Sequence, residues 1–309
     1  MDQIMDDRTA DESLAESFPA AVRALKTGDT ERLKRLLTDR PALAAIRSMQ
    51  GRTLLHHLCD WPGHYPGQLE SARALIAAGA DVNARAIDPE RGETALQWAA
   101  SNDDAAMAEL LIDAGTPVDG LNGDGRPLAQ SIWYGCPQVT ELLLRRGAAL
   151  DLELAAAVGR VDLLPGFFGA HGELLPAAGR HHEPINDSLR SERPCDERVE
   201  QALVYAVLGG SAEAAAWLLA RGADVNARPS GFGRIRAAAL HWAAGGIGAR
   251  SASEAADEES GIRMAELLLD HGADTGLTDS QFGATPLGWA DHFQRRGIAS
   301  LLQERGAVR

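Results

Sequence analysis

A short segment that recurs along the chain constrains its fold more than any other feature. Each copy begins with Thr or Ala and continues with apolar residues, and two of the copies carry a pair of alanines at their end. A second apolar stretch follows, and then a stop of the Gly-Ala-Asp type. The first segments are Thr53–His56, Thr94–Ala100, Ala239–Ala244 and Thr285–Ala290, and the stops begin at Gly79, Gly222 and Gly272. A period of roughly 33 residues with these signatures is typical of stacked helix–turn–helix units, which present surface more than a closed core.

The residues at fixed places in this pattern have physical reasons to be there. A Thr before the first helix can accept a hydrogen bond from a backbone N–H in the first turn, and Pro286 at the first helical position has no N–H to lose. The closing glycine, as at Gly79, can adopt a left-handed backbone conformation without steric cost. Asp81 and Asn83 then favour a turn into the next unit.

Taken together, the Thr-Pro-Leu-His-like segment, the small pair and the Gly-Ala-Asp-Val-Asn stop resemble the ankyrin family. The resemblance covers nearly the whole chain, as about eight units of which the fifth, residues 152–168, is degenerate. It implies an all-α fold, an ankyrin-repeat solenoid of stacked helix–turn–helix units with short hairpin fingers. We expect an acidic N-terminal tail over residues 1–17, an N-terminal block of repeats over 18–168, a central loop insertion over 169–197, and a C-terminal block over 198–309.

The charge of the chain restricts its partners. The net charge of −14 at pH 7 repels nucleic-acid phosphates and favours a partner with a basic surface. The arginine-rich stretch from Arg228 to Arg236 is the one candidate basic patch, and we interpret it as a solvated insertion in a finger. No run is long and apolar enough to span a bilayer, and the acidic start does not resemble a signal peptide. We therefore expect a cytoplasmic protein that contacts neither nucleic acid nor membrane.

Two histidines, His56 and His241, occupy the fourth position of the first segment. In the ankyrin family this histidine generally forms a hydrogen bond between neighbouring fingers, and the resemblance implies the same role here. Gln97 takes this position in the third unit, and apolar or small residues take it in the fourth, sixth and eighth. The polar ladder along the fingers is therefore expected to be interrupted.

Aromatic residues recur at the next position of successive units, which predicts a ridge on the concave groove. Trp and Tyr combine a large apolar area with a hydrogen-bonding group, and they dominate binding hot spots. The alternative is that each ring packs between helices as a core residue, although we expect at least two of the rings to be partly exposed. Lengthened connections over 61–67 and 245–261 and two finger aromatics add further candidates, and we expect the acidic run at 251–259 to be solvated and irregular. The candidate partner-binding residues are His57, Trp61, Tyr65, Trp98, Trp133, Tyr134, Tyr205, Phe232, Trp242, Phe282 and Trp289.

The central insertion is the other place where chemistry is expected. Long loops without structure of their own are usually functional or disordered, and this one holds His181, His182, Glu183 and Cys195. Adjacent histidines on an extended segment point to opposite sides, so the pair is a poor match for one metal ion. Nothing around Cys195 resembles a nucleophile turn. We therefore predict no metal, no cofactor and no catalytic residue.

The sequence thus predicts a protein-interaction module that binds an unidentified protein or peptide in the concave groove. The alternative is a small-molecule site, binding or catalytic, that is roofed by the central loop and lined by His181, His182, Glu183 and Cys195 together with inner-helix aromatics. The alternative stays open because repeat folds accept sites of many kinds.

Overall fold

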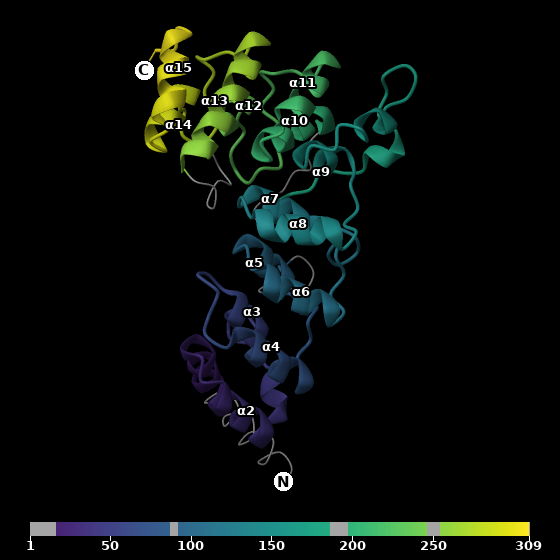
Figure 1. Cartoon of the computed structure of the whole chain (residues 1–309), viewed down its shortest axis with the longest axis vertical. Coiled ribbons are helices and arrows are strands. Elements are labelled where there is room, and N and C mark those ends of the chain that lie inside the picture. Colours follow the sequence, from purple (N-terminus) through teal and green to yellow (C-terminus); the bar gives the residue numbers. More distant parts are fainter. Residues whose placement is uncertain (1–16, 87–91, 186–196, 246–253, 309) are drawn as a thin grey trace. The chain divides into compact units, whose positions relative to one another are not determined.

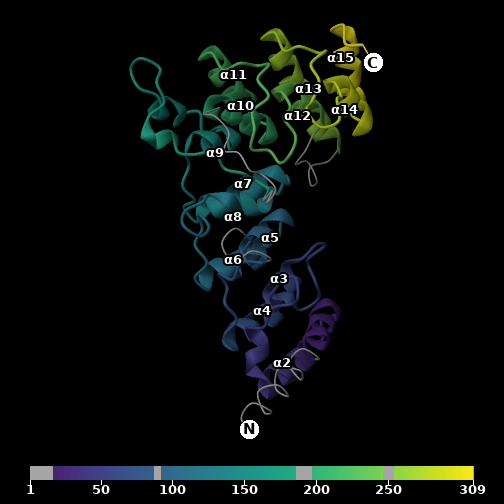
Figure 2. The same ribbon diagram turned by 180° about the vertical axis from the view of Figure 1, so that it is seen from behind.

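The computed structural model describes residues 17–86, 92–185, 197–245 and 254–308, without the side chains of 254–257. It forms two compact units, one of residues 1–127 and 141–146 and the other of residues 128–140 and 147–309. Both units consist of short paired helices, which confirms the all-α class, and Figures 1 and 2 show the pairs from opposite sides. Over the described residues, no helix has the length and apolar character needed to cross a bilayer.

The first unit begins with a helix whose described part spans residues 17–27. It is followed by α2 (Thr30–Asp39), the 3₁₀ helix η1 (Pro41–Ala44), α3 (Leu54–Cys59), α4 (Gln68–Ala77), α5 (Ala95–Ser101) and α6 (Ala105–Asp113). Helix α3 packs against α5, whereas α2 packs against α4 and α4 against α6. The two resulting layers are the inner and outer helices that the repeat pattern predicts.

Helices α7 (Arg126–Trp133) and α8 (Pro137–Arg145) are each divided between the units. The second unit continues with α9 (Leu152–Ala157), the 3₁₀ helices η2 (Leu164–Phe167) and η3 (Pro176–Ala178), α10 (Arg198–Leu208), α11 (Ala212–Ala220), α12 (Ala239–Gly245), α13 (Glu254–Asp270), α14 (Pro286–His292) and α15 (Arg296–Glu304). Within it, α10, α12 and α14 pack in one layer and α11, α13 and α15 in the other.

Threonine caps set where the inner helices begin. The Thr53 hydroxyl accepts from the backbone N–H of His56, and the Thr94 hydroxyl accepts from that of Gln97. In both helices the side chain at the third helical position reaches back to the cap backbone, which completes a capping box. The Thr285 hydroxyl accepts from the backbone N–H of Gly288 at the start of α14, which has proline at its first position.

Closing glycines and Asx turns end the outer helices, as the motif predicts. Gly222 has a φ of 91°, a conformation that costs glycine little. The Asp224 carboxylate then accepts from the Asn226 N–H at 2.9 Å. The Asn226 amide donates to the Gly272 carbonyl at 3.1 Å and accepts from the Asp274 N–H at 2.8 Å, so it joins successive turns.

The acidic run at 251–259 corrects one expectation. Helix α13 already begins at Glu254, so most of this run is helical. Alanine and glutamate have high helix propensity, and carboxylates are favourable in the first turn because they oppose the positive end of the helix dipole. The run therefore has the composition of a helix start as well as that of a solvated segment.

Candidate functional site

The aromatic candidates separate into buried and accessible groups. Five rings of the second unit are buried: Trp133, Tyr205, Phe232, Trp242 and Trp289. The expectation that these rings line an open groove is therefore not met, and they pack in the core of the unit. His57, Tyr65, Trp98 and Tyr134 are partly exposed, and Trp61 and Phe282 are exposed.

Phe232 lies at the centre of the buried rings. It stacks on Trp133 with the ring centroids 6.2 Å apart, and it contacts Tyr205 and Trp242 at 5.5 Å and 5.7 Å. The Trp242 indole N–H donates to the Ala237 carbonyl at 3.2 Å, which satisfies its polar group inside the core. Phe232 belongs to the long finger before α12, and its ring packs on aromatic residues of the inner helices α7, α10 and α12.

Trp289 is fixed by the turn that precedes its own helix. Its indole N–H donates to Asp279 at 3.0 Å, and the same carboxylate accepts the backbone N–H groups of Gln281, Phe282 and Ala284. These hydrogen bonds lower the pKa of Asp279 although burial opposes them. The turn leaves the neighbouring Phe282 side chain 67% exposed.

The adjacent histidines of the central insertion, which we call the central segment from here on, form two histidine–carboxylate pairs at the start of α9. His181 Nδ1 lies 2.8 Å from Glu153 Oε1, and His182 Nε2 lies 2.5 Å from Asp151 Oδ2. Glu153 also accepts the His182 backbone N–H at 2.9 Å, while Asp151 caps α9 by accepting from the Leu154 N–H. The two rings do point to different partners, as expected for neighbours on an extended segment.

These contacts anchor the central segment to the repeats. Glu153 is fully buried, and the Tyr205 hydroxyl donates to the His182 carbonyl. His181 Nε2 is buried without a hydrogen-bond partner and faces Gly231, where a Cβ would lie 1.6 Å from it. The histidine nitrogens are thus directed at the protein itself. The segment is thus held against the start of α9.

The alternative small-molecule site has two further members, Glu183 and Cys195. Glu183 is partly exposed, and Cys195 lies outside the described residues. Within the ranges that the structure describes, no three His, Cys, Asp or Glu side chains are placed to hold a metal ion. The sequence analysis did not single out Asp151 and Glu153. Their only signal was a pair of acids at the start of α9, which follows α8 with a short connection.

The finger histidines occupy the positions that the resemblance implied. His56 Nε2 donates to the Glu93 carbonyl at 3.0 Å, and His241 Nε2 donates to the Ala284 carbonyl at 3.2 Å. His56 Nδ1 accepts from the Thr53 backbone N–H at 3.2 Å, so the ring is a neutral tautomer. Burial lowers the pKa of His56 to about 4 and also lowers that of His241, because charging a buried ring is unfavourable.

Trp98 and its neighbours form an accessible surface on the first unit. The Arg52 guanidinium lies 4.9 Å from the centroid of the Trp98 ring, and the indole N–H donates to Glu93 at 2.9 Å. Arg52 also pairs with Asp60 at 3.1 Å. Trp61 follows Asp60 directly and is 70% exposed. We call residues Arg52, Asp60, Trp61, Glu93 and Trp98 the tryptophan surface.

The other first-unit candidates lie in more enclosed positions. The His57 ring meets Phe18 edge to face with centroids 5.6 Å apart, and burial lowers its pKa. Burial together with the nearby Asp60 charge raises the pKa of Tyr65. Neither ring is as accessible as Trp61, so both border the tryptophan surface more than they build it.

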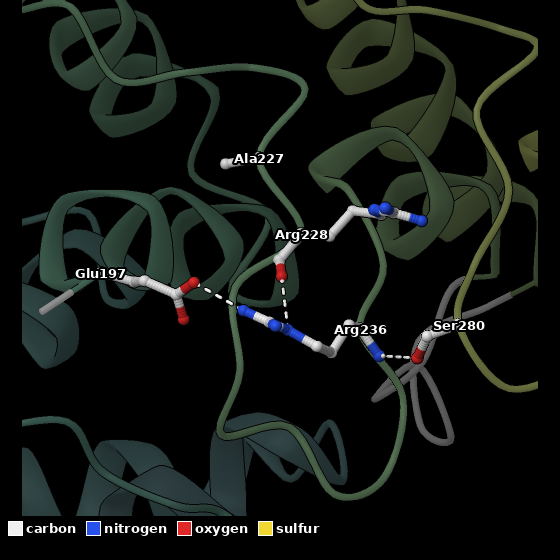
Figure 3. A pocket seen from close by; sticks show the side chains of 5 residues that line it. All are labelled: Glu197, Ala227, Arg228, Arg236 and Ser280. Atoms are coloured by element: carbon white, nitrogen blue, oxygen red, sulfur yellow. Dashed lines mark hydrogen bonds and ion pairs between the residues drawn. The ribbon is translucent and has the colours of Figure 1, made fainter. Parts of the chain in front are cut away.

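A pocket of about 500 Å³ opens between two fingers of the second unit, lined by Glu197, Ala227, Arg228, Arg236 and Ser280 (Figure 3). Arg236 crosses it. Its guanidinium pairs with Glu197 at 2.7 Å and donates to the Arg228 carbonyl at 3.1 Å, while its backbone N–H donates to the Ser280 hydroxyl at 2.8 Å. The arginine-rich stretch therefore forms one wall of this pocket, and Arg228 and Arg236 are exposed there, in agreement with the solvated finger insertion that the sequence suggested.

Comparison with known proteins gives a match to a family model over part of the chain. Residues 65–153 match the family model described as "Ankyrin repeats (3 copies)", so the chain contains ankyrin repeats over this segment. The solved structure of the human ASB11 ankyrin repeat domain is 19% identical, with a TM-score of 0.43, and the match covers 94% of this chain and 98% of that one. No curated protein matches the chain.

Proposed function

We propose that the chain is a protein-interaction module and that it binds its partner through the tryptophan surface of the first unit. Ankyrin repeats generally serve as protein-interaction modules, and residues 65–153 match the ankyrin-repeat model. The observation that carries the proposal is the exposure of Trp61, which at 70% is unusual for so large an apolar side chain.

The composition of the tryptophan surface supports this role. Trp and Arg are the residues most enriched at binding hot spots, and here Arg52 lies over Trp98 while its guanidinium also pairs with Asp60. The side chains are thus held in place before any partner arrives, which reduces the entropy lost on binding. Asp60 and Glu93 add negative charge to the surface, and the net charge of −14 favours a basic partner surface.

The histidine pair supports an anchoring role more than a ligand site. Both rings are held by carboxylates at the start of α9, and the free Nε2 of His181 faces a glycine backbone. We therefore place the function on the accessible surface of the repeats.

Capture of partners from lysate tests the proposal. Replacing Trp61 and Trp98 together by Ala should weaken capture by about 2 kcal/mol or more where a ring is a hot spot. The control is Phe293→Ala, which removes an exposed aromatic ring from the second unit, outside the tryptophan surface. Undiminished capture by a folded Trp61→Ala, Trp98→Ala chain, with helicity checked by circular dichroism, would refute the proposal.

A further inference from the structure

Arg228 lines the pocket of the second unit, and its positive charge has no carboxylate partner among the described residues. Its guanidinium donates to the Thr278 carbonyl at 2.9 Å, and among the described residues no carboxylate pairs with it. The side chain is exposed, and it belongs to a chain whose net charge is −14. A guanidinium presents five N–H donors in a planar fork, so most of this donor capacity faces solvent.

The other charges of the pocket are already paired. Glu197 accepts from the Ser230 backbone N–H and hydroxyl at 2.8 Å and 2.7 Å and also pairs with Arg236. Figure 3 shows the Arg228 guanidinium pointing away from Glu197, on the opposite side of the pocket. The network therefore fixes Glu197 and Arg236 and leaves the charge of Arg228 without a carboxylate partner among the described residues.

We infer that this pocket binds an acidic side chain of an extended peptide segment, with the carboxylate received by Arg228. A carboxylate matches the planar fork in a bidentate geometry. The charged lining residues are Arg228, Arg236 and Glu197, so the single net positive charge that they carry balances a carboxylate better than a doubly charged phosphate. The inference concerns a second surface and does not depend on the tryptophan surface.

The finger that contains Ser280 indicates which kind of residue lies beside the acidic residue in the bound peptide. Phe282 lies two residues after Ser280 in the same finger and is 67% exposed. An exposed ring next to a cationic pocket favours an apolar side chain adjacent to the carboxylate in the bound segment. The expected ligand is thus a peptide in which Glu or Asp alternates with apolar residues.

Fluorescence anisotropy on the full chain tests the inference with three labelled peptides. The first alternates Glu with Leu, the second carries Gln in place of every Glu, and the third carries phosphoserine in those positions. Arg228→Glu is compared with Arg263→Glu, which makes the same charge change on α13, where Arg263 pairs only with Glu259 among the described residues.

Binding of the Glu peptide should exceed that of the Gln peptide by at least about tenfold, and Arg228→Glu should lower it by a similar factor. Arg263→Glu should leave it within about twofold, because that arginine lies outside the pocket. No binding of the Glu peptide, equal loss in the two variants, or preference for the phosphoserine peptide would each overturn the inference. A Trp61→Ala chain should bind the Glu peptide normally, which separates this test from that of the proposed function.

Discussion

His56→Gln is a substitution whose effect on stability should change sign with pH. His56 joins two fingers through the Glu93 carbonyl and completes the capping box of α3. Gln97 forms the same capping box in the next unit, with its side-chain oxygen 2.9 Å from the Thr94 N–H. The variant should therefore preserve the helix start. It should lose the link between the fingers because the glutamine side chain does not place a donor where His56 Nε2 lies.

The size of the effect follows from the pKa of His56. Its value falls from 6.5 to about 4 in the folded chain. Because the unfolded chain binds a proton first, the stability associated with neutral His56 is complete above pH about 6.5 and is lost as the pH falls toward about 4. At pH about 5 this loss amounts to about 2 kcal/mol. The missing hydrogen bond costs the variant about 1 kcal/mol at every pH.

Urea unfolding followed by circular dichroism between pH about 7.5 and about 5 measures both contributions. The wild-type chain should be more stable at neutral pH by about 1 kcal/mol, the variant should be more stable at the acidic end by a similar amount, and the curves should cross near pH about 6. His57 and His241 titrate in both proteins, so their contributions cancel in the difference. Parallel curves for the two proteins would show that His56 is not the titrating group and would refute the reasoning.

Three further predictions concern the second unit. Gly231→Ala places a methyl group 1.6 Å from the ring of His181 at a φ of 106°, so it should lower the free energy of unfolding by about 3 kcal/mol or more. Gly222→Ala, with a φ of 91° and no neighbour within 4 Å, should lower it by only about 1–2 kcal/mol. Urea denaturation compares the two variants, and equal losses of stability would contradict the packing of Gly231 against His181. Glu153→Ala should cost about 3–5 kcal/mol because it leaves buried donors unpaired, and hydrogen exchange should show increased opening of α9; an unchanged exchange rate would count against the anchor. Trp242→Ala should cost about 3–5 kcal/mol in thermal unfolding, and a cost below about 1 kcal/mol would show that the ring is not part of the core.

The helical pairs could be predicted from the sequence because their signals are local. A threonine cap, a small pair and a closing glycine act within one unit, and Thr53, Thr94 and Thr285 all begin helices as the motif requires. The finger contacts of His56 and His241 were available only through the family resemblance. Start and stop signals of this kind do not depend on the rest of the chain.

Which aromatic rings are buried could not be predicted from the repeat pattern, because the exposure of a ring depends on segments that are distant in the sequence. Trp98 and Trp242 occupy the same position of their repeats, yet Trp242 is buried against Phe232 from a long finger and Trp98 is partly exposed beside Arg52. The pairing of His181 with Glu153 joins residues that lie 28 positions apart in the sequence. Such contacts arise from tertiary packing and leave no periodic signal in the sequence.

Site-specific photo-crosslinking tests the central claim most directly, that partners bind the tryptophan surface of the first unit. A photoreactive phenylalanine analogue would replace Trp61 in one chain and Val308, which is 79% exposed in the second unit, in another. The account predicts that irradiation with a captured partner joins it covalently to the chain labelled at position 61, and that Trp98→Ala in the same chain lowers the yield. Equal yields from both positions, or adducts from position 308 alone, would contradict it.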